Sequence, residues 1–577
     1  MNRRNFINLG MAGGIISAFP TLIACKKLPA KSVLPEIPVD PVIPEDPDKT
    51  KELSADLVIT GGGLGGCAAA LGALRNGLTV VLAEETDWIG GQIATQGVPP
   101  DEHTWIETHG ATKLYRDFRT AVRRYYLNNY PLTDAARAQT YLNPGAGSVS
   151  RLCHEPRVAL AVLYEMLNPY ISLGKLTLLT EYKAVSADVI GDRVRALKVA
   201  HVRKKDEKVL TAPYFVDATE LGDLLPLTGT EFRTGTESRS ETNELHAPEK
   251  GDPKNQQAFT LCFALDYDKD ENHTIDKPAE YDFWRNYVPA LTPPWSGRLL
   301  SLMYSNPSTL EPKALGFHPE GLSTGDALNL WVYRRIIAKQ NFKPGAYNSD
   351  ITIVNWPQND YLLGNLDSSE EDFNRHVAGA KQLNRSLLYW LQTEAPRPDG
   401  GQGWPGLRLR GDIMGTDDGM AKYPYIREAR RIKALFTVLE EHVGKENRLQ
   451  VSGKDKAADF YDSIGVGYYH IDLHPSTGGD NYIDFPSLPY QIPLGALIPQ
   501  RMENLLPANK NIGTTHITNG CYRLHPVEWG IGETVGMLTS FALQKKTTPR
   551  AIRENEGLLT EFQKIIQEQG VEIRWPE

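Results

Sequence analysis

The sequence predicts an α/β protein, and the order of its apolar runs carries that prediction. A β-like run at 55–60 leads into a glycine-rich turn at 61–66, and an alanine-rich, helix-like run follows at 68–74. A second β-like run occupies 78–85, and a third, at 214–217, ends on an aspartate. Strand, tight turn, helix and strand in this order form a β-α-β unit, whose two strands lie parallel in one sheet.

Length and charge narrow the class of protein further. The chain has 577 residues, of which 41% are hydrophobic and 23% charged, and this is ordinary for a globular protein. Its length is enough for a large core and more than one domain. The formal net charge of -9 argues against a general nucleic-acid binder. We therefore expect a globular protein with no nucleic-acid partner.

The first 25 residues have the features of an export signal. Arg3 and Arg4 precede an apolar stretch that ends near Ala24 and is short for a membrane span. The pattern resembles a twin-arginine signal, and "LIAC" at 22–25 resembles a bacterial lipoprotein box. We expect an exported lipoprotein, anchored by a lipid at Cys25 to the periplasmic face of a bacterial membrane. The alternative is an apolar leader with a chance pair of arginines.

Two further features concern the linker and the thiols. Residues 26–52 are rich in proline, which favours an extended, semi-rigid linker. The other four cysteines, at 67, 153, 262 and 521, are far apart and form no C-x-x-C pair. We therefore expect buried thiols and predict no metal site.

The turn at 61–66 has the spacing of a dinucleotide-binding fingerprint, G-x-G-x-x-G, between a strand and a helix. The first glycine permits a tight turn, the second lets the backbone approach a diphosphate, and the third lets helix and sheet pack closely. The helix N-terminus attracts the phosphates, and an acidic residue ending the second strand accepts the ribose hydroxyls. A glycine-rich turn without a ligand is the alternative. The predicted nucleotide-binding residues here are Gly61, Gly63, Leu64, Gly65, Gly66, Glu84 and Glu85.

FAD and NAD both suit such a unit, and residues beyond it favour FAD. A glycine pair soon after the second strand is expected where backbone lies flat against an isoalloxazine ring. The third strand is similar to the "ATG" strand of two-dinucleotide-domain flavoproteins, except that Glu220 stands where glycine is usual. The predicted FAD contacts are Gly90, Gly91 and Gln92 after the second strand, and Asp217, Ala218 and Thr219 at the end of the third.

The C-terminal segment 504–543 is predicted to reach the same cofactor from the other side. It contains "GIGETVG" at 530–536, but no β-like run leads directly into this motif and only residues 537–577 follow it. A complete second β-α-β unit does not fit there comfortably. We expect instead a helix that begins at Gly532, with Gly513, Gly532 and Glu533 close to the flavin.

These motifs together resemble the bacterial FAD-dependent oxidoreductase family, a branch of the glutathione-reductase-like flavoproteins. Matching pieces extend along nearly the whole mature chain and include "WIGGQ" (88–92), "VDATELGDLL" (216–225), "DSIGVGYYHIDLH" (462–474) and "PYQIPLGALIPQ" (489–500). The resemblance implies a discontinuous, Rossmann-like FAD-binding domain with an inserted α+β substrate domain. The expected boundaries are 53–232 and 459–550 for the FAD-binding domain, 233–458 for the substrate domain, and 551–577 for a C-terminal helix and tail.

Flavin chemistry needs a partner for the proton while hydride moves, and histidine suits this near neutral pH. His516 and His525 lie in the segment expected to face the flavin and rank first, and His103 follows the flavin-facing loop. His470 and His474 are four apart, as in a metal pair on a helix, but their apolar neighbours equally favour a strand. A structural role is the alternative for each histidine.

Two arginines are candidates for binding negative charge. Arg427 lies in "IREARR" at 426–431, which is expected to be helical, and Arg523 lies between the two leading histidines. Either guanidinium could hold an anionic substrate group or stabilise the negative charge of reduced flavin. The alternative is an ion-paired helix that supports the domain junction.

The region 235–455 is rich in aromatic residues beside Asn, Gln and Asp. Such rings can stack on sugar faces while polar groups bind hydroxyls, and they can equally belong to the core. Together with the lipoprotein signal, this composition favours a sugar or glycoside as substrate. The tryptophans concerned are Trp284, Trp295, Trp331, Trp356 and Trp404.

We therefore predict an FAD-dependent dehydrogenase or oxidase that takes hydride from a small polar substrate. Its electrons pass to an external acceptor, because the sequence offers no convincing NAD(P)H domain. A flavin monooxygenase and a redox-neutral flavoprotein (an isomerase or lyase) are alternatives with the same cofactor. A non-catalytic, lipid-anchored binding protein is the alternative from another class.

Overall fold

The structure is a computed structural model that describes residues 52–576. The expected export signal, the lipid anchor at Cys25 and nearly all of the proline-rich linker lie outside the described residues. Within 52–576, no helix combines the length and the apolar character that crossing a bilayer requires.

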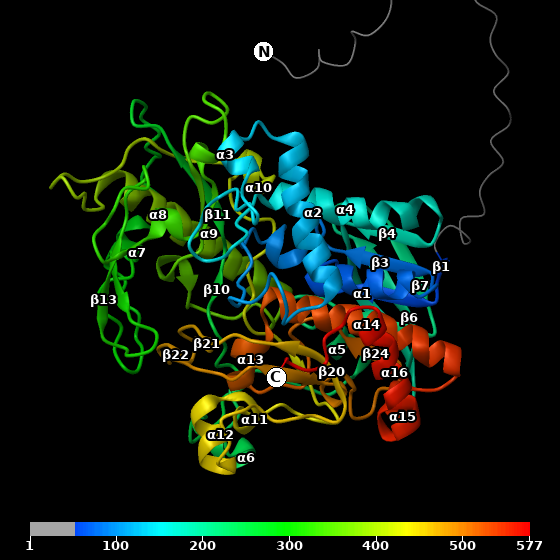
Figure 1. Ribbon diagram of the computed structural model, residues 1–577. Coiled ribbons are helices and arrows are strands. Elements are labelled where there is room, and N and C mark those ends of the chain that lie inside the picture. The colour runs from blue at the N-terminus through cyan, green and yellow to red at the C-terminus, as the bar shows by residue number, and fades with distance from the viewer. Residues whose placement is uncertain (1–51, 577) are drawn as a thin grey trace, which may run out of the picture. The chain divides into compact units, whose positions relative to one another are not determined.

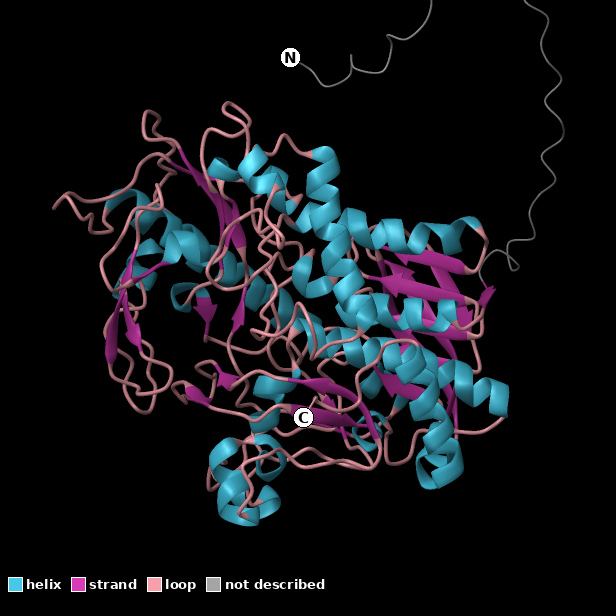
Figure 2. Ribbon diagram, viewed as in Figure 1, coloured by secondary structure: helices cyan, strands magenta, loops and turns pink. Residues whose placement is uncertain are grey.

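A five-stranded parallel sheet confirms the α/β prediction (Figure 2). The strands β2, β3 and β8 are buried along their whole length, as parallel strands covered on both faces should be. The C-terminal β24 pairs with β8, so that segments far apart in the chain share this sheet. Across the sheet the order is β24 (Leu505–Pro507), β8 (Tyr214–Asp217), β2 (Leu57–Thr60), β3 (Val80–Glu84) and β4 (Leu176–Thr180).

Helix α1 (Leu64–Arg75) connects β2 to β3 and completes the predicted β-α-β unit. The long C-terminal helix α14 (His525–Lys545) packs along α1, and Figure 1 shows this orange helix against the blue one. The other helices of this part of the chain are α2 (Lys113–Asn129), α3 (Asp134–Arg137), α4 (Pro156–Ser172), α5 (Leu224–Thr228), α15 (Pro549–Glu554) and α16 (Glu556–Glu568).

A second, four-stranded sheet packs against one face of the parallel sheet. Val58, Val81 and Phe215 point from the parallel sheet into the apolar cluster that joins the two, where they meet Leu197 and Leu210. Side chains alternate between the two faces of a strand, so this face is apolar in both sheets. The strands of the four-stranded sheet, in order, are β1 (Glu52–Ser54), β7 (Glu207–Thr211), β6 (Arg193–His201) and β5 (Tyr182–Ile190).

The middle of the chain builds an antiparallel sheet, covered in part by the 24-residue helix α9 (Glu370–Thr393). Its strands, in order, are β15 (Arg335–Ile337), β16 (Ile351–Val354), β11 (Phe263–Tyr267) and β18 (Leu407–Leu409). Smaller elements around it are β10 (Phe259–Thr260) with β17 (Asp360–Tyr361), β12 (Met303–Ser305), β13 (Pro312–Gly316), β14 (Leu328–Asn329), α7 (Tyr281–Asn286), α8 (Leu330–Tyr333) and α10 (Gly411–Met414).

Short paired strands connect this middle region to the C-terminal segment. β21 (Ile471–Leu473) pairs with β22 (Ile483–Phe485), and β20 (Ser463–Gly467) pairs with β23 (Tyr490–Pro493). The remaining elements are β9 (Phe232–Arg233) with β19 (Arg431–Ile432), α11 (Glu440–Val443), α12 (Lys445–Ser452) and α13 (His516–Tyr522). The short helix α6 (Arg239–Thr242) lies apart from the antiparallel sheet, next to α11 and α12 (Figure 1).

Two local predictions are wrong. Residues 426–431 are extended rather than helical, because the three arginines of this run form ion pairs with carboxylates in different parts of the fold. The pairs are Arg427–Asp360, Arg430–Asp223 and Arg431–Glu237. Helix α14 begins at His525 rather than at Gly532, with a proline in its first turn, where the missing N–H costs nothing.

The five tryptophans singled out in the middle region are buried. Trp331 is fully buried, and the other four tryptophans of the predicted set are at most 6% exposed. The expectation of buried thiols is confirmed for the described residues, where Cys67, Cys153, Cys262 and Cys521 are free and buried.

Candidate active site

The glycine-rich turn brings the ends of β2 and β8 into backbone contact. β2 ends at Thr60 and α1 begins at Leu64, so three glycines span the turn. Gly61 has a φ of 96°, and a Cβ carbon there would lie 2.2 Å from the carbonyl oxygen of Ala218. Only glycine fits such a position. The turn after β8 therefore lies directly against the fingerprint.

A narrow cleft with about 460 Å³ of open space lies at this edge of the sheet. The carboxyl ends of parallel strands are where α/β proteins bind nucleotides. The structure gathers predicted cofactor residues from several segments here: the cleft is lined by Gly61, Gly63, Glu84, Glu85, Gly91, Ala218 and Thr219. Asp217 instead supports the turn, because its carboxylate accepts hydrogen bonds from the backbone N–H groups of Thr219 and Leu224.

Glu84, the predicted ribose ligand, faces the fingerprint. Its Oε2 accepts a hydrogen bond from the Gly62 N–H at 2.6 Å, and its Oε1 accepts one from the Thr86 N–H at 2.9 Å. Burial, and then the charge of Glu85, raise the pKa of Glu84 to about 7. The carboxylate is thus fixed in place at the wall of the cleft, where a ribose hydroxyl could donate to it.

Two carboxylates stand at the N-terminus of α1. Glu528, in the first turn of α14, accepts a hydrogen bond from the Gly65 N–H at 2.9 Å and another from the Gln92 side chain. Glu220 pairs with Lys510, and its Oε1 has no hydrogen-bond partner in the described part of the chain. Burial, and then the charge of Glu220, raise the pKa of Glu528 to about 7.

The groups around the turn fit FAD. The N–H groups of the α1 N-terminus, together with Lys510, can bind a diphosphate if the Glu528 carboxylate gives way. The segment beyond the glycine pair then offers buried polar atoms that lack partners among residues 52–576: Gln92 Oε1 and both side-chain amide atoms of Gln96. Such atoms need a ligand that both donates and accepts, as the isoalloxazine ring does.

A second cavity, with about 770 Å³ of open space, draws its walls from the inserted region and the C-terminal segments. We call it the Asp–Arg–His pocket. Its charged and amide-bearing lining residues are Asp101, Arg334, Asn355, Arg427, His470, Asp472, His474, Asp484 and Arg523. Aromatic rings complete the walls, from Tyr304, Tyr333, Trp356, Tyr425, Tyr469 and Tyr482.

Each arginine of this pocket has a carboxylate partner. Burial alone would raise the pKa of Asp472, but His474 and Arg523 beside it hold that pKa below its usual value. The pocket is therefore lined by balanced charges of both signs. The nitrogen–oxygen distances are 3.2 Å for Arg334–Asp101, 3.1 Å for Arg427–Asp360 and 2.9 Å for Arg523–Asp472.

Two histidines of the pocket each bind an aspartate through Nδ1. The distance is 2.6 Å both for His470 to Asp484 and for His474 to Asp360. The Nε2 of His474 also lies 3.8 Å from Asp472. The two histidines flank strand β21, so the alternation of the sequence indicated their environment better than the helical spacing did.

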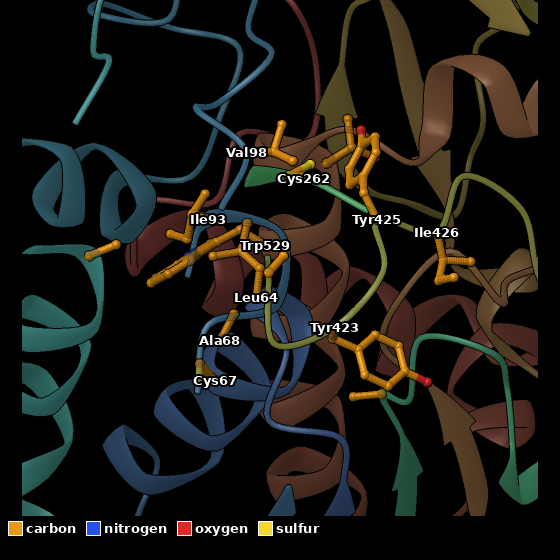
Figure 3. Packing of buried hydrophobic residues seen from close by; sticks show 14 of the residues in the cluster. Leu64, Cys67, Ala68, Ile93, Val98, Cys262, Tyr423, Tyr425, Ile426 and Trp529 are labelled. Carbon is orange, nitrogen blue, oxygen red and sulfur yellow. The ribbon is translucent and has the colours of Figure 1, made fainter. Parts of the chain in front are cut away.

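One extended segment links the cleft and the pocket. Tyr423 lines the cleft, and Tyr425, two residues later, lines the pocket. Figure 3 shows the Tyr425 ring next to Cys262 and the Tyr423 ring directed away from it. A second link is Gln92, whose Nε2 donates to the Arg523 carbonyl oxygen at 3.0 Å. A ring bound beyond the glycine pair would therefore lie next to the pocket.

The histidine ranked first by the sequence, His516, lines neither cavity. It is buried at the start of α13. Its ring Nδ1 lies 2.8 Å from the Glu428 carboxylate, and its backbone N–H donates a hydrogen bond to the Glu237 carboxylate. Burial opposes the imidazolium charge, yet Glu428 raises the pKa of His516 above its usual value. This geometry is that of a buried ion pair.

His525 and His103 are also buried outside the pocket. His525 Nδ1 accepts a hydrogen bond from the Asp101 N–H at 3.1 Å, and burial lowers its pKa to about 3. His103 Nε2 lies 3.1 Å from the Gly110 carbonyl oxygen, and burial lowers its pKa to about 4. Of the five predicted catalytic residues, only Arg427 and Arg523 line the pocket.

The predicted C-terminal cofactor residues serve helix and loop packing. Gly532 contacts α1, Gly513 packs against Ala434, and Glu533 accepts a hydrogen bond from Trp529 Nε1 at 3.1 Å. Sequence reasoning passed over Glu528 and Lys510. The sequence offered His470 and His474 either as a metal pair on a helix or as part of a strand, and as a strand "HIDLH" places His470, Asp472 and His474 on one face.

The chain matches the family described as FAD dependent oxidoreductase over residues 56–566. It belongs to that family. FAD is therefore its cofactor, and the expectation of an FAD-dependent oxidoreductase is confirmed at the level of the enzyme class. No curated protein matches the chain.

Solved structures resemble this FAD dependent oxidoreductase only distantly. The p-nitrophenol 4-monooxygenase PnpA from Pseudomonas putida DLL-E4 is 11% identical over 90% of this chain and 87% of its own, with a TM-score of 0.34. The OxyS anhydrotetracycline hydroxylase from Streptomyces rimosus is 10% identical over 89% and 66%, with a TM-score of 0.32. The chain spans 34% of the Sdh1 complex chain from Mycobacterium smegmatis, at 11% identity over 29% of this chain and a TM-score of 0.21. These likenesses are too weak to carry conclusions about substrate or partner.

Proposed function

We propose that this protein is an FAD-dependent dehydrogenase or oxidase that removes hydride from a small, neutral, polyhydroxylated compound such as a sugar or glycoside. The observation that carries the proposal is the adjacency of the fingerprint cleft and the Asp–Arg–His pocket, joined through Tyr423 and Tyr425. An oxidised FAD accepts hydride, and the pocket offers the neighbouring place for a substrate.

The charges of the pocket favour a neutral substrate. Each of its three guanidinium groups already forms an ion pair with an aspartate, so a substrate anion would have to compete with a carboxylate that is in place. The Nε of each of these arginines has no hydrogen-bond partner among residues 52–576 and can donate to a hydroxyl. Hydroxyl groups donate and accept, and can therefore bind beside carboxylates and guanidinium groups alike. The side-chain nitrogens of Asn355 and Trp356 lack partners among the described residues and can donate to a hydroxyl.

The chain's own residues hold and orient the reactants. Glu84, Lys510 and the N–H groups of the α1 N-terminus would hold the ribose and diphosphate of FAD. Arg523 is fixed between the Tyr425 hydroxyl at 3.0 Å and Asp472, so its orientation is set before substrate enters.

The electrons then pass to an external acceptor, because the fingerprint at 61–66 is the one dinucleotide motif that the sequence offers. Export by the twin-arginine route and a lipid at Cys25 would place the enzyme at the periplasmic face of a bacterial membrane. The support for this location is the pattern of Arg3, Arg4 and "LIAC" in the sequence. Membrane-bound electron carriers would then be within reach.

Anaerobic reduction of the bound flavin tests the proposal. The purified protein is mixed with sugars, glycosides, amino acids and hydroxy acids, and absorbance near 450 nm is followed, at roughly the flavin maximum. We expect bleaching by at least one neutral sugar or glycoside. An Asp472→Asn variant should keep its flavin and lose much of that response. Bleaching by hydroxy acids alone would overturn the substrate class, and a colourless wild-type protein would overturn the function.

A further inference from the structure

The two His–Asp pairs of the pocket differ in what their outer nitrogen does. His474 binds Asp360 through Nδ1, and its Nε2 faces Asp472 at 3.8 Å. His470 binds Asp484 through Nδ1 at 2.6 Å, and its Nε2 has no hydrogen-bond partner among residues 52–576. The side chain of His470 is also the more accessible of the two, at 39% exposed against 19%.

We propose that His470 is the catalytic base of this enzyme and that Asp484 is its positioning residue; the proposal rests on the function proposed above. A neutral imidazole that donates its Nδ1–H to a carboxylate presents a lone pair at Nε2. Because His470 lines the pocket, that lone pair is available to a substrate hydroxyl.

The step balances as the oxidation of an alcohol. The substrate O–H bond breaks and its proton goes to His470 Nε2. The adjacent C–H bond breaks, its hydride goes with two electrons to the oxidised FAD of the family, and a C=O bond forms. The imidazolium left on His470 is then compensated by the Asp484 carboxylate, which is only 12% exposed. A carboxylate that orients a histidine and compensates its charge is a recurring catalytic arrangement.

The neighbours of His470 come from several elements and carry both signs. Asp484 approaches from β22, Asp472 from β21, and Arg523 follows α13. Burial disfavours the imidazolium, but the hydrogen bond to Asp484 and the charge of Asp472 raise the pKa of His470 above its usual value. A base with a raised pKa is a stronger proton acceptor, at the cost of being partly protonated at neutral pH.

The first test compares wild type, His470→Gln and Asp484→Asn in single-turnover reduction by a substrate found in the bleaching panel. General-base loss should slow His470→Gln about 10²- to 10⁴-fold, with flavin content and substrate affinity retained. In wild type the rate should rise with pH as His470 loses its proton. Asp484→Asn should shift that rise to lower pH and lower its plateau. His273→Gln is the matched control, because His273 pairs with Glu271 at 2.6 Å and lines neither cavity.

A second readout needs neither substrate nor turnover. Carbethoxylation of His470 by diethyl pyrocarbonate, followed by mass spectrometry of its peptide against pH, reports the pKa of this one imidazole. We expect it above that of a free histidine in wild type and lower in Asp484→Asn. An unchanged titration in Asp484→Asn, or reduction of His470→Gln at the wild-type rate, would overturn the proposal. If no panel compound reduces the wild type, the function proposed above fails, while the titration still decides whether the His470–Asp484 pair exists.

Discussion

Gly532 in α14 faces Gly65 in α1 so closely that a Cβ carbon on Gly532 would lie 2.0 Å from the Gly65 carbonyl oxygen. The contact repeats one turn later, where a Cβ on Gly536 would lie 2.1 Å from the Ala69 carbonyl oxygen. Because Gly65 belongs to the fingerprint, the C-terminal helix supports the end of α1 that is predicted to bind the diphosphate. Gly532, which lies nearly 470 positions after Gly65, therefore contributes to the predicted cofactor site through its packing against α1.

Gly532→Ala should therefore weaken both folding and cofactor binding. The added methyl group has no space, and overpacking of this kind costs about 1–3 kcal/mol. The displaced α1 N-terminus should also bind FAD less well. Denaturant unfolding and the flavin-to-protein absorbance ratio measure the two effects.

Gly530→Ala is the matched control in the same helix. A Cβ there would meet only a Thr112 methyl group, at 3.7 Å. Alanine is the better helix former, by up to about 1 kcal/mol, so this variant should be neutral or stabilised and keep its flavin. Equal losses in both variants would mean that the close contact of Gly532 is not what matters.

Glu528→Gln should strengthen FAD binding at alkaline pH. The Glu528 carboxylate takes up the Gly65 N–H, which a diphosphate needs, and its charge opposes the diphosphate. Since its pKa is raised to about 7, wild type should bind FAD more tightly at pH 6, where Glu528 is protonated, than at pH 8.5. The glutamine variant should lose most of this difference, as measured by titrating apoprotein with FAD.

The same variant affects the stability of the apoprotein. When the pKa of a carboxyl group is higher in the folded state than in the unfolded state, the group stabilises the folded state fully at any pH below its unfolded-state pKa. This stabilisation is lost as pH rises through the folded-state pKa. The free energy of unfolding of the apo Glu528→Gln variant should therefore increase relative to that of the wild-type apoprotein as pH rises from 5 to 8. FAD affinity with the same pH dependence in both proteins would show that another group opposes the diphosphate.

Cys25→Ala should release the protein from the membrane. If Cys25 carries the lipid, the alanine variant is exported without an anchor and appears in the soluble periplasmic fraction. Changing Arg3 and Arg4 to lysines should instead retain the protein in the cytoplasm, because the twin-arginine signal is lost. Cell fractionation with immunodetection separates these outcomes, and membrane association of Cys25→Ala at the wild-type level would contradict the anchor.

The cofactor cleft was predictable because its determinants are local. Gly61 has a positive φ, which favours glycine whatever the rest of the chain does, and the strand, turn and helix around it follow one another in the sequence. The apolar runs of β2 and β3 likewise show a buried parallel sheet. The conformation of the turn and the burial of these strands are thus indicated by a few residues that are neighbours in the sequence.

The pocket was harder to predict because its residues meet through tertiary contacts. His470 and Asp484 are brought together by the pairing of β21 with β22, and Arg427 meets Asp360 across the core. The extended course of 426–431 has the same cause, since buried ion pairs outweigh helix propensity there. Position in the chain favoured His516, but nothing in its neighbourhood revealed the buried Glu428.

His516→Gln should destabilise the protein rather than slow its chemistry directly. The variant leaves Glu428 buried with its charge only partly compensated by Arg431, and breaking a buried pair costs about 3 kcal/mol or more.

The pH dependence of the stability loss identifies the His516–Glu428 pair as its cause. His516 has a raised pKa, so its stabilisation is complete below the unfolded value near 6.5 and is lost as pH rises through the folded value. Despite its burial, Glu428 is held by His516 at a pKa of about 2, so its stabilisation is lost only as pH falls toward that value. The difference in unfolding free energy between wild type and His516→Gln should therefore be largest at mildly acidic pH and should shrink as pH rises through the raised pKa of His516. His273→Gln, which changes an exposed pair, should show no comparable loss. Wild-type stability of His516→Gln with slowed flavin reduction would instead return His516 to the catalytic site.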